Sequence, residues 1–325
     1  MTVPARAVVF QEPGRITFEQ LELPSPGEED LVVRILRSAI SPGTERWLLR
    51  GQYSPARFPL VPGYQSVGIV EHTGANVRGI TPGDCVFVGT TRVQDGMHAW
   101  WGAHASAAVV HHARVLPIPW GLGLDEAALS PLAAVAHHGA RILGIHRGMV
   151  AVVVGLGMVG QLVSQILGRL GATVIGSEPL KGRRDRTSVL GMRTVDPARE
   201  NLEEVVRTVS PDGVDVVVEC TGRTALLGDC LRLLRFGGTL SLQGYYPGDV
   251  AFPFEPAHRG EVTIKCPRGW PRADHEAALA LMARGELQVG PLITHRLPAA
   301  EACRAYELLE KEPEGTLGVV LIWDE

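Results

Sequence analysis

Apolar residues follow two different patterns along the chain, and the change comes near residue 125. Before it, short apolar runs are separated by Gly and Pro. The strands predicted by these runs are Ala7–Phe10, Leu31–Leu36, Val67–Glu71, Cys85–Val88 and Ala107–His111. Because short apolar runs bounded by turn residues are typical of strands, and helical patterns are scarce here, we expect this half to be a mainly β domain.

After Asp125 the pattern predicts helices alternating with strands. The predicted helices are 126–143, 158–170, 182–190, 224–234, 274–283 and 299–310. The predicted strands are 149–154, 173–177, 214–220, 238–243, 261–266 and 318–323. Such alternation favours an α/β fold, a parallel sheet with helices on both faces. The final helices and strand would suit a return to the first domain.

The connection after the first strand of the second half has the pattern of a dinucleotide-binding turn. Gly155, Gly157 and Gly160 form G-x-G-x-x-G, and the next strand leads to Glu178. Glycines there allow a tight turn, close approach of a pyrophosphate and close helix–strand packing. The cofactor-binding residues predicted at this turn are Gly155, Gly157, Met158, Val159 and Gly160. The alternative is an ordinary β-α-β turn that merely needs small residues.

The choice between NAD and NADP depends on the residues around Glu178. Its carboxylate can accept hydrogen bonds from both adenosine ribose hydroxyls and would repel a 2′-phosphate, which favours NAD. Lys181, Arg183 and Arg184 follow and could instead hold that phosphate, or simply form a solvated helix start. NAD is therefore the predicted cofactor, with NADP as the alternative and Arg183 as a further binding residue.

Two more loops are expected to contact the nicotinamide half of the cofactor. Thr221 and Gly222 follow one predicted strand, and Gly244 and Tyr245 follow the next. Open α/β sheets bind ligands beyond the carboxyl ends of their strands. We therefore predict that Thr221, Gly244 and Tyr245 bind the cofactor.

Composition and charge indicate which partners and which cellular compartment to expect. Lys plus Arg is 31 and Asp plus Glu is 35 in 325 residues, a net charge of −4, which gives no reason to expect nucleic acid or an anionic membrane as a partner. The five cysteines lack paired spacing, and Met1–Gln11 does not lead into a long apolar run. We therefore expect a cytoplasmic protein with reduced thiols and no membrane span.

Taken together, the chain resembles the medium-chain dehydrogenase/reductase superfamily, which includes the zinc alcohol dehydrogenases and zinc-free relatives. The segment Val61-Pro-Gly-Tyr-Gln-Ser-Val-Gly-Ile-Val70, the turn Pro82-Gly-Asp-Cys-Val86 and the glycine turn carry this resemblance. Residues 40–45, 60–66 and 290–296 resemble the branch that contains the bacteriochlorophyllide 3-hydroxyethyl dehydrogenases.

The resemblance implies a Rossmann doubly wound parallel sheet inserted into a mainly β, GroES-like catalytic domain. The implied divisions are 1–125 for the first part of the catalytic domain, 126–266 for the NAD(P)-binding domain and 267–325 for the return segment. We expect a homodimer that acts on a small-molecule substrate.

The main departure from that superfamily concerns zinc. Ser41, Tyr64, Gln65 and Ser130 stand where zinc members carry Cys, His, Glu, and Cys or Glu, and residues 89–104 contain no Cys for a structural zinc. Hydroxyl and amide groups are poor zinc ligands at neutral pH, so we predict no metal. The histidine pairs, such as His98 and His104, 111–112 and 137–138, are interpreted as partly exposed or core-edge imidazoles.

A dehydrogenase without a metal must still move the proton of the reacting oxygen. Tyr64, Ser41, Thr44 and Gln65 offer groups that could bind an oxygen there, and Thr44 matches the relay hydroxyl of alcohol dehydrogenases. Tyr64 could instead only fill the space left by the metal. A phenol with a pKa of ~10 is a poor base at pH 7, so a catalytic Tyr64 would need a cation or relay.

Two histidines and one acid complete the predicted catalytic residues. His104 and His98 are the candidates for the partner of Tyr64. Glu45 follows Thr44 where the resembled family has an acid, and we interpret it as more structural than catalytic.

Three functions remain open on this basis. The leading hypothesis is a zinc-independent, NAD(P)-dependent oxidoreductase that interconverts a secondary alcohol and a ketone on a bulky or cyclic substrate, possible in a specialised biosynthetic pathway. The second is an NADPH-dependent enoyl or quinone reductase, although Gly155-Leu156-Gly157 keeps the alcohol dehydrogenase form of the turn. The third is a non-catalytic NAD-binding sensor.

Overall fold

The computed structural model describes residues 1–189 and 191–324, which divide into two units. The first unit contains Met1–Pro131, Met282–Arg284 and the chain from Ile293 onward. The second contains Leu132–Leu281 and Gly285–Leu292. The catalytic and nucleotide-binding parts predicted from the sequence therefore have distinct structural counterparts, and each is described by itself.

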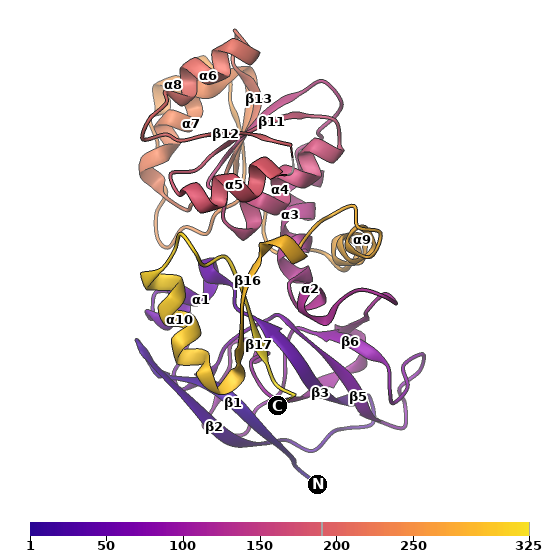
Figure 1. Cartoon of the computed structure of the whole chain (residues 1–325). Helices are drawn as coiled ribbons and strands as arrows, with labels where there is room; N and C mark the ends of the chain where they lie inside the picture. The colour runs from indigo at the N-terminus through magenta and orange to yellow at the C-terminus, as the bar shows by residue number, and fades with distance from the viewer. Residues whose placement is uncertain (190, 325) are drawn as a thin grey trace. The chain divides into compact units, whose positions relative to one another are not determined.

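The first unit is built mainly from strands, as the short apolar runs predict (Figure 1). Its strands are β1 Val3–Glu12, β2 Arg15–Leu23, β3 Asp30–Ala39, β4 Leu60–Val61, β5 Ser66–Thr73, β6 Cys85–Val88, β7 His98–Ala99, β8 Ala107–His111, β9 Val115–Pro117, β16 Ile293–Pro298 and β17 Gly318–Ile322. Its helices are α1 Pro42–Leu49, α2 Leu124–Ala128 and α10 Ala302–Lys311, with short η1 His112–Arg114 and η4 Ala299–Glu301.

The strands of the first unit form two sheets, which bury one large apolar cluster and two smaller ones. One sheet has the order β2-β1-β4-β7, and the other has β16-β17-β3-β5-β6-β9 with β8 paired to β3. The return segment joins the second sheet, because β17 pairs antiparallel with β3 and places Val320 opposite Ala39. Phe10, Leu31 and Ile35 are buried in the core beside Tyr306 from α10. The predicted return of the chain to its first domain is confirmed.

The second unit contains the remaining elements. Its strands are β10 Val150–Val154, β11 Thr173–Ser177, β12 Arg193–Val195, β13 Val214–Glu219, β14 Leu234–Leu242 and β15 Thr263–Lys265. Its helices are α3 Ser130–Ile142, which begins at the unit boundary, α4 Met158–Arg169, α5 Lys181–Val189, α6 Leu202–Val209, α7 Leu227–Leu233, α8 Phe254–Arg259 and α9 Arg272–Ala283, with short η2 Thr224–Leu226 and η3 Gly290–Leu292.

The six strands of the second unit form one parallel sheet in the order β12-β11-β10-β13-β14-β15. The strand order reverses direction at β10, so right-handed crossovers put α4 and α5 on one face and α6 and α7 on the other (Figure 1). The predicted doubly wound fold is confirmed. Ligands of such sheets bind beyond the strand ends at the point of reversal, which lies between β10 and β13.

Several predicted elements differ from the structure in their limits. The helix predicted over 126–143 is two helices, α2 and α3, because the ring of Pro131 cannot fit against the carbonyl four residues earlier in a continuous helix. The helix predicted over 182–190 is α5, and Leu190 lies outside the described residues. The sequence analysis missed the helices α1, α6 and α8 and the strands β2, β4, β7, β9, β12 and β16.

The limits of the two units also differ from the predicted domain limits. The first unit extends to Pro131 rather than to residue 125, and the second unit keeps most of α9, up to Leu281, rather than ending at residue 266. α9 stays with the second unit because Asp274 on α9 hydrogen-bonds to His137 on α3.

Candidate functional site

The glycine turn connects β10 to α4 and is tightly packed. Gly155 has φ +89, and a Cβ there would lie 2.5 Å from Cγ2 of Thr221. A Cβ at Gly160 would lie 1.9 Å from the carbonyl oxygen of Gly155. Only glycine fits both positions, since the first has a left-handed backbone and the second touches the main chain.

The middle glycine of the turn faces open space. Gly157 is the N-cap of α4, and the one atom that a Cβ would meet within 4 Å is Nη1 of Arg183 at 4.0 Å. Met158 and Val159 open the helix, Met158 being buried and Val159 half-buried. The N-terminal N–H groups and the partial positive charge of a helix attract anions, so this is the part of the turn that a phosphate could approach.

Glu178 follows β11 and its carboxylate is buried beside the glycine turn. Its Oε2 accepts a hydrogen bond from the Leu156 N–H at 2.9 Å, and its Oε1 accepts one from the Leu180 N–H at 3.1 Å. Nη1 of Arg183 lies 3.7 Å from Oε2. Because each carboxylate oxygen can accept more than one hydrogen bond, the acid remains able to bind hydroxyl groups.

The three cations after Glu178 have different surroundings. Arg184 pairs with Asp196 at 2.9 Å and donates to the carbonyl oxygen of Glu178, so it stabilises the fold. Lys181 forms an exposed pair with Asp185. Arg183 alone among the three approaches both Gly157 and the Glu178 carboxylate.

Glu219 at the end of β13 is a candidate site residue that the sequence analysis missed. Its side chain is fully buried and accepts hydrogen bonds from the Thr221 N–H at 2.7 Å and the Gly222 N–H at 2.9 Å. The hydroxyls of Thr221 and Tyr246 also donate to it. Burial and the Glu219 carboxylate raise the pKa of Tyr246 well above its usual range, so the phenol remains a donor. The available signal was an acid at the end of a strand whose other residues, apart from Asp215, are all valines.

Glu219 thereby holds together the two loops predicted to contact the cofactor. Its backbone carbonyl accepts the N–H of Gly244 at 2.8 Å, and a Cβ at Gly244 would lie 2.4 Å from the nitrogen of Gly222. A Cβ at Gly222 would in turn lie 2.3 Å from the oxygen of Tyr245. The loops after β13 and β14 are in backbone contact, with Thr221 and Tyr245 on their exposed side.

The predicted proton-handling residues of the first unit cluster around Tyr64. The Tyr64 hydroxyl donates to Oγ of Ser41 at 2.7 Å and also hydrogen-bonds to Thr44. Burial raises the pKa of Tyr64 well above its usual range. The phenol is therefore neutral and acts as a hydrogen-bond donor, not as a base.

Gln65 and Ser130 are both buried. The side chain of Gln65 hydrogen-bonds to the main chain and not to Tyr64 or Ser41. Its Nε2 donates to the carbonyl oxygen of Ala39 at 3.1 Å, and its Oε1 has no hydrogen-bond partner among residues 1–189 and 191–324. Ser130 is the first residue of α3.

Glu45 and His104 form a separate buried network. Nε2 of His104 lies 2.9 Å from Oε2 of Glu45, Nδ1 lies 2.8 Å from Oγ of Ser38, and the Tyr306 hydroxyl donates to Glu45. Both nitrogens of His104 are thus engaged, so it has none left for Tyr64. The geometry opposes the expected assistance of Tyr64 by His104 and favours the structural interpretation of Glu45. The other candidate, His98, is exposed on β7.

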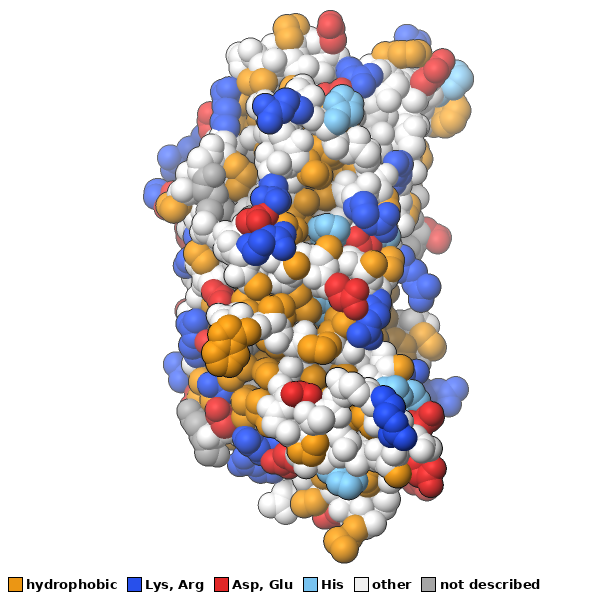
Figure 2. Space-filling model, turned by 90° about the vertical axis from the view of Figure 1, so that its right-hand side faces the viewer, with side chains coloured by type: hydrophobic (Ala, Val, Ile, Leu, Met, Phe, Trp, Pro, Cys, Tyr) orange, Lys and Arg blue, Asp and Glu red, His pale blue; other side chains and the backbone are white. Residues whose placement is uncertain are grey.

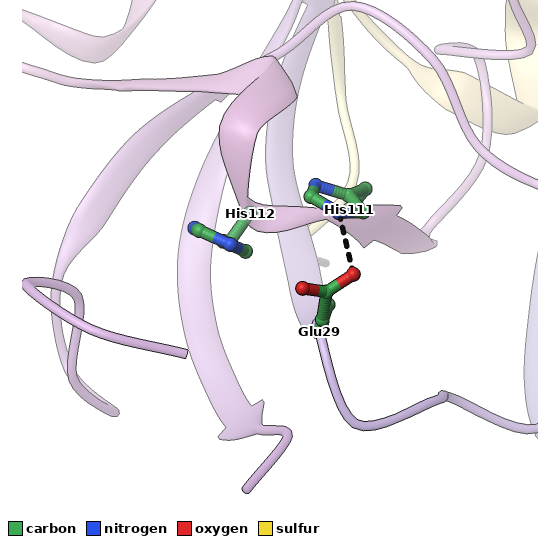
Figure 3. Close-up of side chains that lie close together, drawn as sticks. All are labelled: Glu29, His111 and His112. Carbon is green, nitrogen blue, oxygen red and sulfur yellow. Dashed lines mark hydrogen bonds and ion pairs between the residues drawn. The ribbon is translucent and has the colours of Figure 1, made fainter. Parts of the chain in front are cut away.

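A second histidine pair lies beside Glu29 on the surface (Figure 3). Glu29, His111 and His112 bring possible metal ligands within 4.8 Å of one another. However, Nδ1 of His111 accepts the Ala113 N–H at 3.1 Å, which places the proton of a neutral ring on Nε2, 3.1 Å from Glu29. This arrangement suits a hydrogen-bonded surface group better than a metal site.

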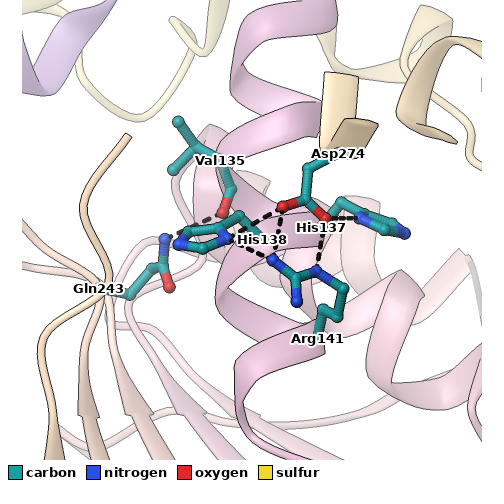
Figure 4. Close-up of polar contacts among 6 residues, drawn as sticks. All are labelled: Val135, His137, His138, Arg141, Gln243 and Asp274. Atoms are coloured by element: carbon teal, nitrogen blue, oxygen red, sulfur yellow. Dashed lines mark hydrogen bonds and ion pairs between the residues drawn. The ribbon is translucent and has the colours of Figure 1, made fainter. Parts of the chain in front are cut away.

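The pair on α3 surrounds a buried acid from α9 (Figure 4). Arg141 contacts both oxygens of Asp274 at 2.8 and 2.9 Å, and Nδ1 of His137 and of His138 lie 2.7 and 3.0 Å from them. The Arg141 guanidinium holds the pKa of Asp274 well below its usual range. The group fastens α9 to α3.

Two properties are relevant to possible partners: the distribution of charge on the surface and the length and apolar character of the helices. On the face shown in Figure 2, Lys and Arg side chains are interspersed with Asp and Glu. None of the helices in the described ranges has the length and apolar character that crossing a membrane requires.

Comparison with known proteins supports one family for both units. Residues 27–120 match the alcohol dehydrogenase GroES-like domain, and residues 158–284 match the zinc-binding dehydrogenase family. The 2-desacetyl-2-hydroxyethyl bacteriochlorophyllide A dehydrogenases of Rhodobacter capsulatus and Cereibacter sphaeroides are 32% and 31% identical to the chain, each over 98% of both proteins.

A solved structure shows the same relationship together with a cofactor. A protein from Sinorhizobium meliloti, described as a zinc-binding dehydrogenase and bound to NADP, is 27% identical and superposes with a TM-score of 0.86 over 98% of this chain and 99% of that one. The chain therefore belongs to the medium-chain dehydrogenase/reductase superfamily and is an alcohol dehydrogenase-type oxidoreductase with a nicotinamide cofactor and a small-molecule substrate.

Proposed function

We propose that the protein interconverts a secondary alcohol and a ketone on a bulky or cyclic substrate, with NAD(H) and without zinc. The observation that carries this proposal is the buried cluster of three hydroxyls, in which Tyr64 donates to Ser41 and contacts Thr44. The names of the bacteriochlorophyllide dehydrogenases, which specify a hydroxyethyl group on a large ring system, support a substrate of this class.

The hydroxyl cluster supplies the proton chemistry in this proposal. The nicotinamide carries the hydride to or from the carbinol carbon when it is bound. When substrate binds, the Tyr64 O–H turns from Ser41 to the substrate oxygen and so stabilises the charge that develops there. Ser41 or Thr44 then donates to the Tyr64 oxygen, since each hydroxyl both donates and accepts. In ketone reduction Tyr64 gives its proton to the substrate oxygen and regains one from solvent through the half-buried Thr44, and in alcohol oxidation the proton takes the reverse path.

The zinc that the family name implies does not fit the residues present. Ser41 and Tyr64 are hydrogen-bonded to each other, Tyr64 keeps its proton, and the amide nitrogen of Gln65 is bound to the Ala39 carbonyl. Together with Ser130 they offer no thiolate, imidazole or carboxylate, which are the groups that bind zinc in proteins. No step of the proposed reaction therefore uses a metal.

Metal analysis tests this part of the proposal. We expect purified protein to contain far less than about one zinc per chain, and EDTA to leave the Tm and the activity unchanged, because structural and catalytic zinc sites need ligands that are missing here. A chelator control on a zinc alcohol dehydrogenase should show loss of activity. Stoichiometric zinc would contradict the prediction.

The predicted preference for NAD rests on Glu178. NADH should bind more tightly than NADPH, and Glu178→Ala should narrow the difference, since a hydrogen bond to a charged acceptor contributes about 1.5–3 kcal/mol, or at least tenfold. Because Glu178 also accepts the Leu156 N–H, the matched variant is Arg183→Ala, which should weaken NADPH more than NADH. Calorimetric dissociation constants for NADH and NADPH test the preference. Tighter binding of NADPH than of NADH by the wild type would reverse the assignment of NAD as the cofactor.

A substrate panel separates this function from its alternatives. Oxidation of secondary alcohols and reduction of ketones, but not of enones or quinones, supports the proposal. Reduction of enones with NADPH would favour the enoyl or quinone reductase. Cofactor binding without turnover of any class would favour a non-catalytic sensor.

We also propose a cytoplasmic homodimer without nucleic-acid partners, in which 1–125 and 267–325 serve catalysis and 126–266 serves nucleotide binding. These proposed functional limits differ from the limits of the compact units, which end at Pro131 and include most of α9 in the second unit. All five cysteines are free thiols, as a reducing compartment favours. Within the described residues β15 pairs only with β14, so its outer edge is available for a strand of a second copy. Sedimentation of the purified protein tests the dimer.

A further inference from the structure

Four aromatic rings of the first unit, one of which is that of Tyr64, form a cluster of contacts. The ring of Trp101 lies 5.1 Å from that of Tyr64, 5.6 Å from Trp100 and 6.0 Å from Tyr53, and Tyr53 lies 5.6 Å from Trp100, all with the edge of one ring toward the face of another. Tyr64 is buried, whereas the other three rings are partly exposed. We name Tyr53, Trp100 and Trp101 the aromatic platform.

The backbone at Trp101 is strained. Its φ is +67, in the left-handed region that a bulky aromatic residue rarely adopts. Trp100 packs against the main core of the unit and Trp101 does not belong to that packing, so burial in the core does not explain the strain. Strained residues are concentrated at ligand-binding sites, where the surrounding structure holds them.

The structure that holds Trp101 is the segment that carries Tyr64. The N–H of Trp100 donates to the Val61 carbonyl at 3.0 Å, and the N–H of Ala103 donates to the Gly63 carbonyl at 2.8 Å. The Trp101 carbonyl in turn accepts the N–H of Thr91 at 3.0 Å. The main chain at Trp100 and Trp101 and the segment that carries Tyr64 are therefore fixed relative to each other by main-chain hydrogen bonds.

One polar atom of the platform lacks a partner. Nε1 of Trp100 is buried and has no hydrogen-bond partner among the described residues. A buried N–H without a partner is unfavourable, and buried indole groups usually find one. An acceptor on a bound molecule would satisfy it.

We propose that the aromatic platform selects substrates whose reacting carbinol or carbonyl carbon is attached directly to a planar aromatic ring. This inference rests on the proposed function. The ring of the substrate packs on Trp101, and the oxygen one carbon away from that ring accepts the hydrogen bond of Tyr64. The centroids of the Trp101 and Tyr64 rings are 5.1 Å apart, so a substrate ring that packs on Trp101 lies beside Tyr64, and its reacting oxygen has to be close to that ring.

Two ketones of similar size test the selection. Acetophenone has a planar aromatic ring, and cyclohexyl methyl ketone has a saturated ring of the same number of atoms. Since aromatic pairs gain specific stabilisation beyond their buried area, the wild type should show roughly three- to tenfold higher kcat/KM for acetophenone. Trp101→Leu should bring the ratio to about one, and Trp101→Phe should keep most of it.

The matched control is Trp120→Leu, because Trp120 is fully exposed at 101% and outside the platform. It should leave the ratio unchanged. A wild-type ratio near one, or a ratio that survives in a folded Trp101→Leu protein, would overturn the proposal.

A binding measurement separates failure of this inference from failure of the proposed function. Saturation-transfer NMR of acetophenone with the protein needs no turnover. Transfer to the phenyl protons that is lost in Trp101→Leu and kept in Trp120→Leu supports the platform even if no ketone is reduced, in which case only the proposed function is wrong. Transfer that is absent in the wild type or unchanged in Trp101→Leu would overturn the platform.

Discussion

Replacing Tyr64 by Phe is expected to lower kcat for ketone reduction by about 10²- to 10⁴-fold while leaving cofactor binding nearly unchanged. Loss of a proton donor or of a hydrogen bond to a developing oxyanion has effects of this size. Thr44→Val should act in the same direction, since Thr44 contacts the same hydroxyl. Single-turnover hydride transfer measures the effect directly.

Stability measurements distinguish this role from packing. Tyr64→Phe removes only the oxygen that donates to Ser41, so the free energy of unfolding should fall by only about 1 kcal/mol. If Tyr64 merely fills space, both variants will transfer hydride at the wild-type rate. That result would remove the hydroxyl cluster from the mechanism.

Replacing Glu219 by Ala is expected to destabilise the second unit by roughly 2–4 kcal/mol and to weaken cofactor binding at least tenfold. The carboxylate accepts hydrogen bonds from the main chain of Thr221 and Gly222 and from the hydroxyl of Tyr246, and donors left without a partner when a buried charged acceptor is removed carry costs of this order. Thermal unfolding and calorimetric titration with NADH provide the two measurements.

Glu219→Gln and Glu255→Ala sharpen this experiment. Gln should not rescue the protein, because its amide NH₂ would face donors instead of accepting from them. Glu255 is an exposed acid in an i,i+4 pair with Arg259, so its removal should change stability by less than about 0.5 kcal/mol. Wild-type stability and NADH affinity in Glu219→Ala would mean that the two loops hold together without the carboxylate.

Local patterns explain why the nucleotide-binding half could be predicted. The positions of Gly155, Gly157 and Gly160 relative to an apolar strand and to Glu178 depend only on neighbours in sequence and on the period of each element. The mainly β first unit was predicted for the same reason. The helix break at Pro131 was also visible in the sequence and was missed because the apolar pattern continues across it.

Features that depend on distant residues could not be predicted. The partner of Glu45 at Tyr306 lies 261 positions away, so the contact that supports the structural interpretation of Glu45 could not be found among its neighbours in sequence. Glu219 acts by joining loops that follow two different strands. His104 was a candidate for the partner of Tyr64, but the fold turns its ring toward Ser38 and Glu45.

The acid at the junction of α3 and α9 has a consequence for proton uptake. Since the pKa of Asp274 is held well below its usual value, the stability that Asp274 contributes is fully present above the ordinary carboxyl pKa of about 3.9 and is lost as the pH falls below it. Its neighbour His275 is buried, and burial lowers the pKa of His275 to about 4, so from about pH 6.5 downward the unfolded chain takes up a proton that the folded one does not. At both residues the folded protein binds fewer protons than the unfolded chain. Acidification therefore weakens the attachment of α9, first through His275 and then through Asp274.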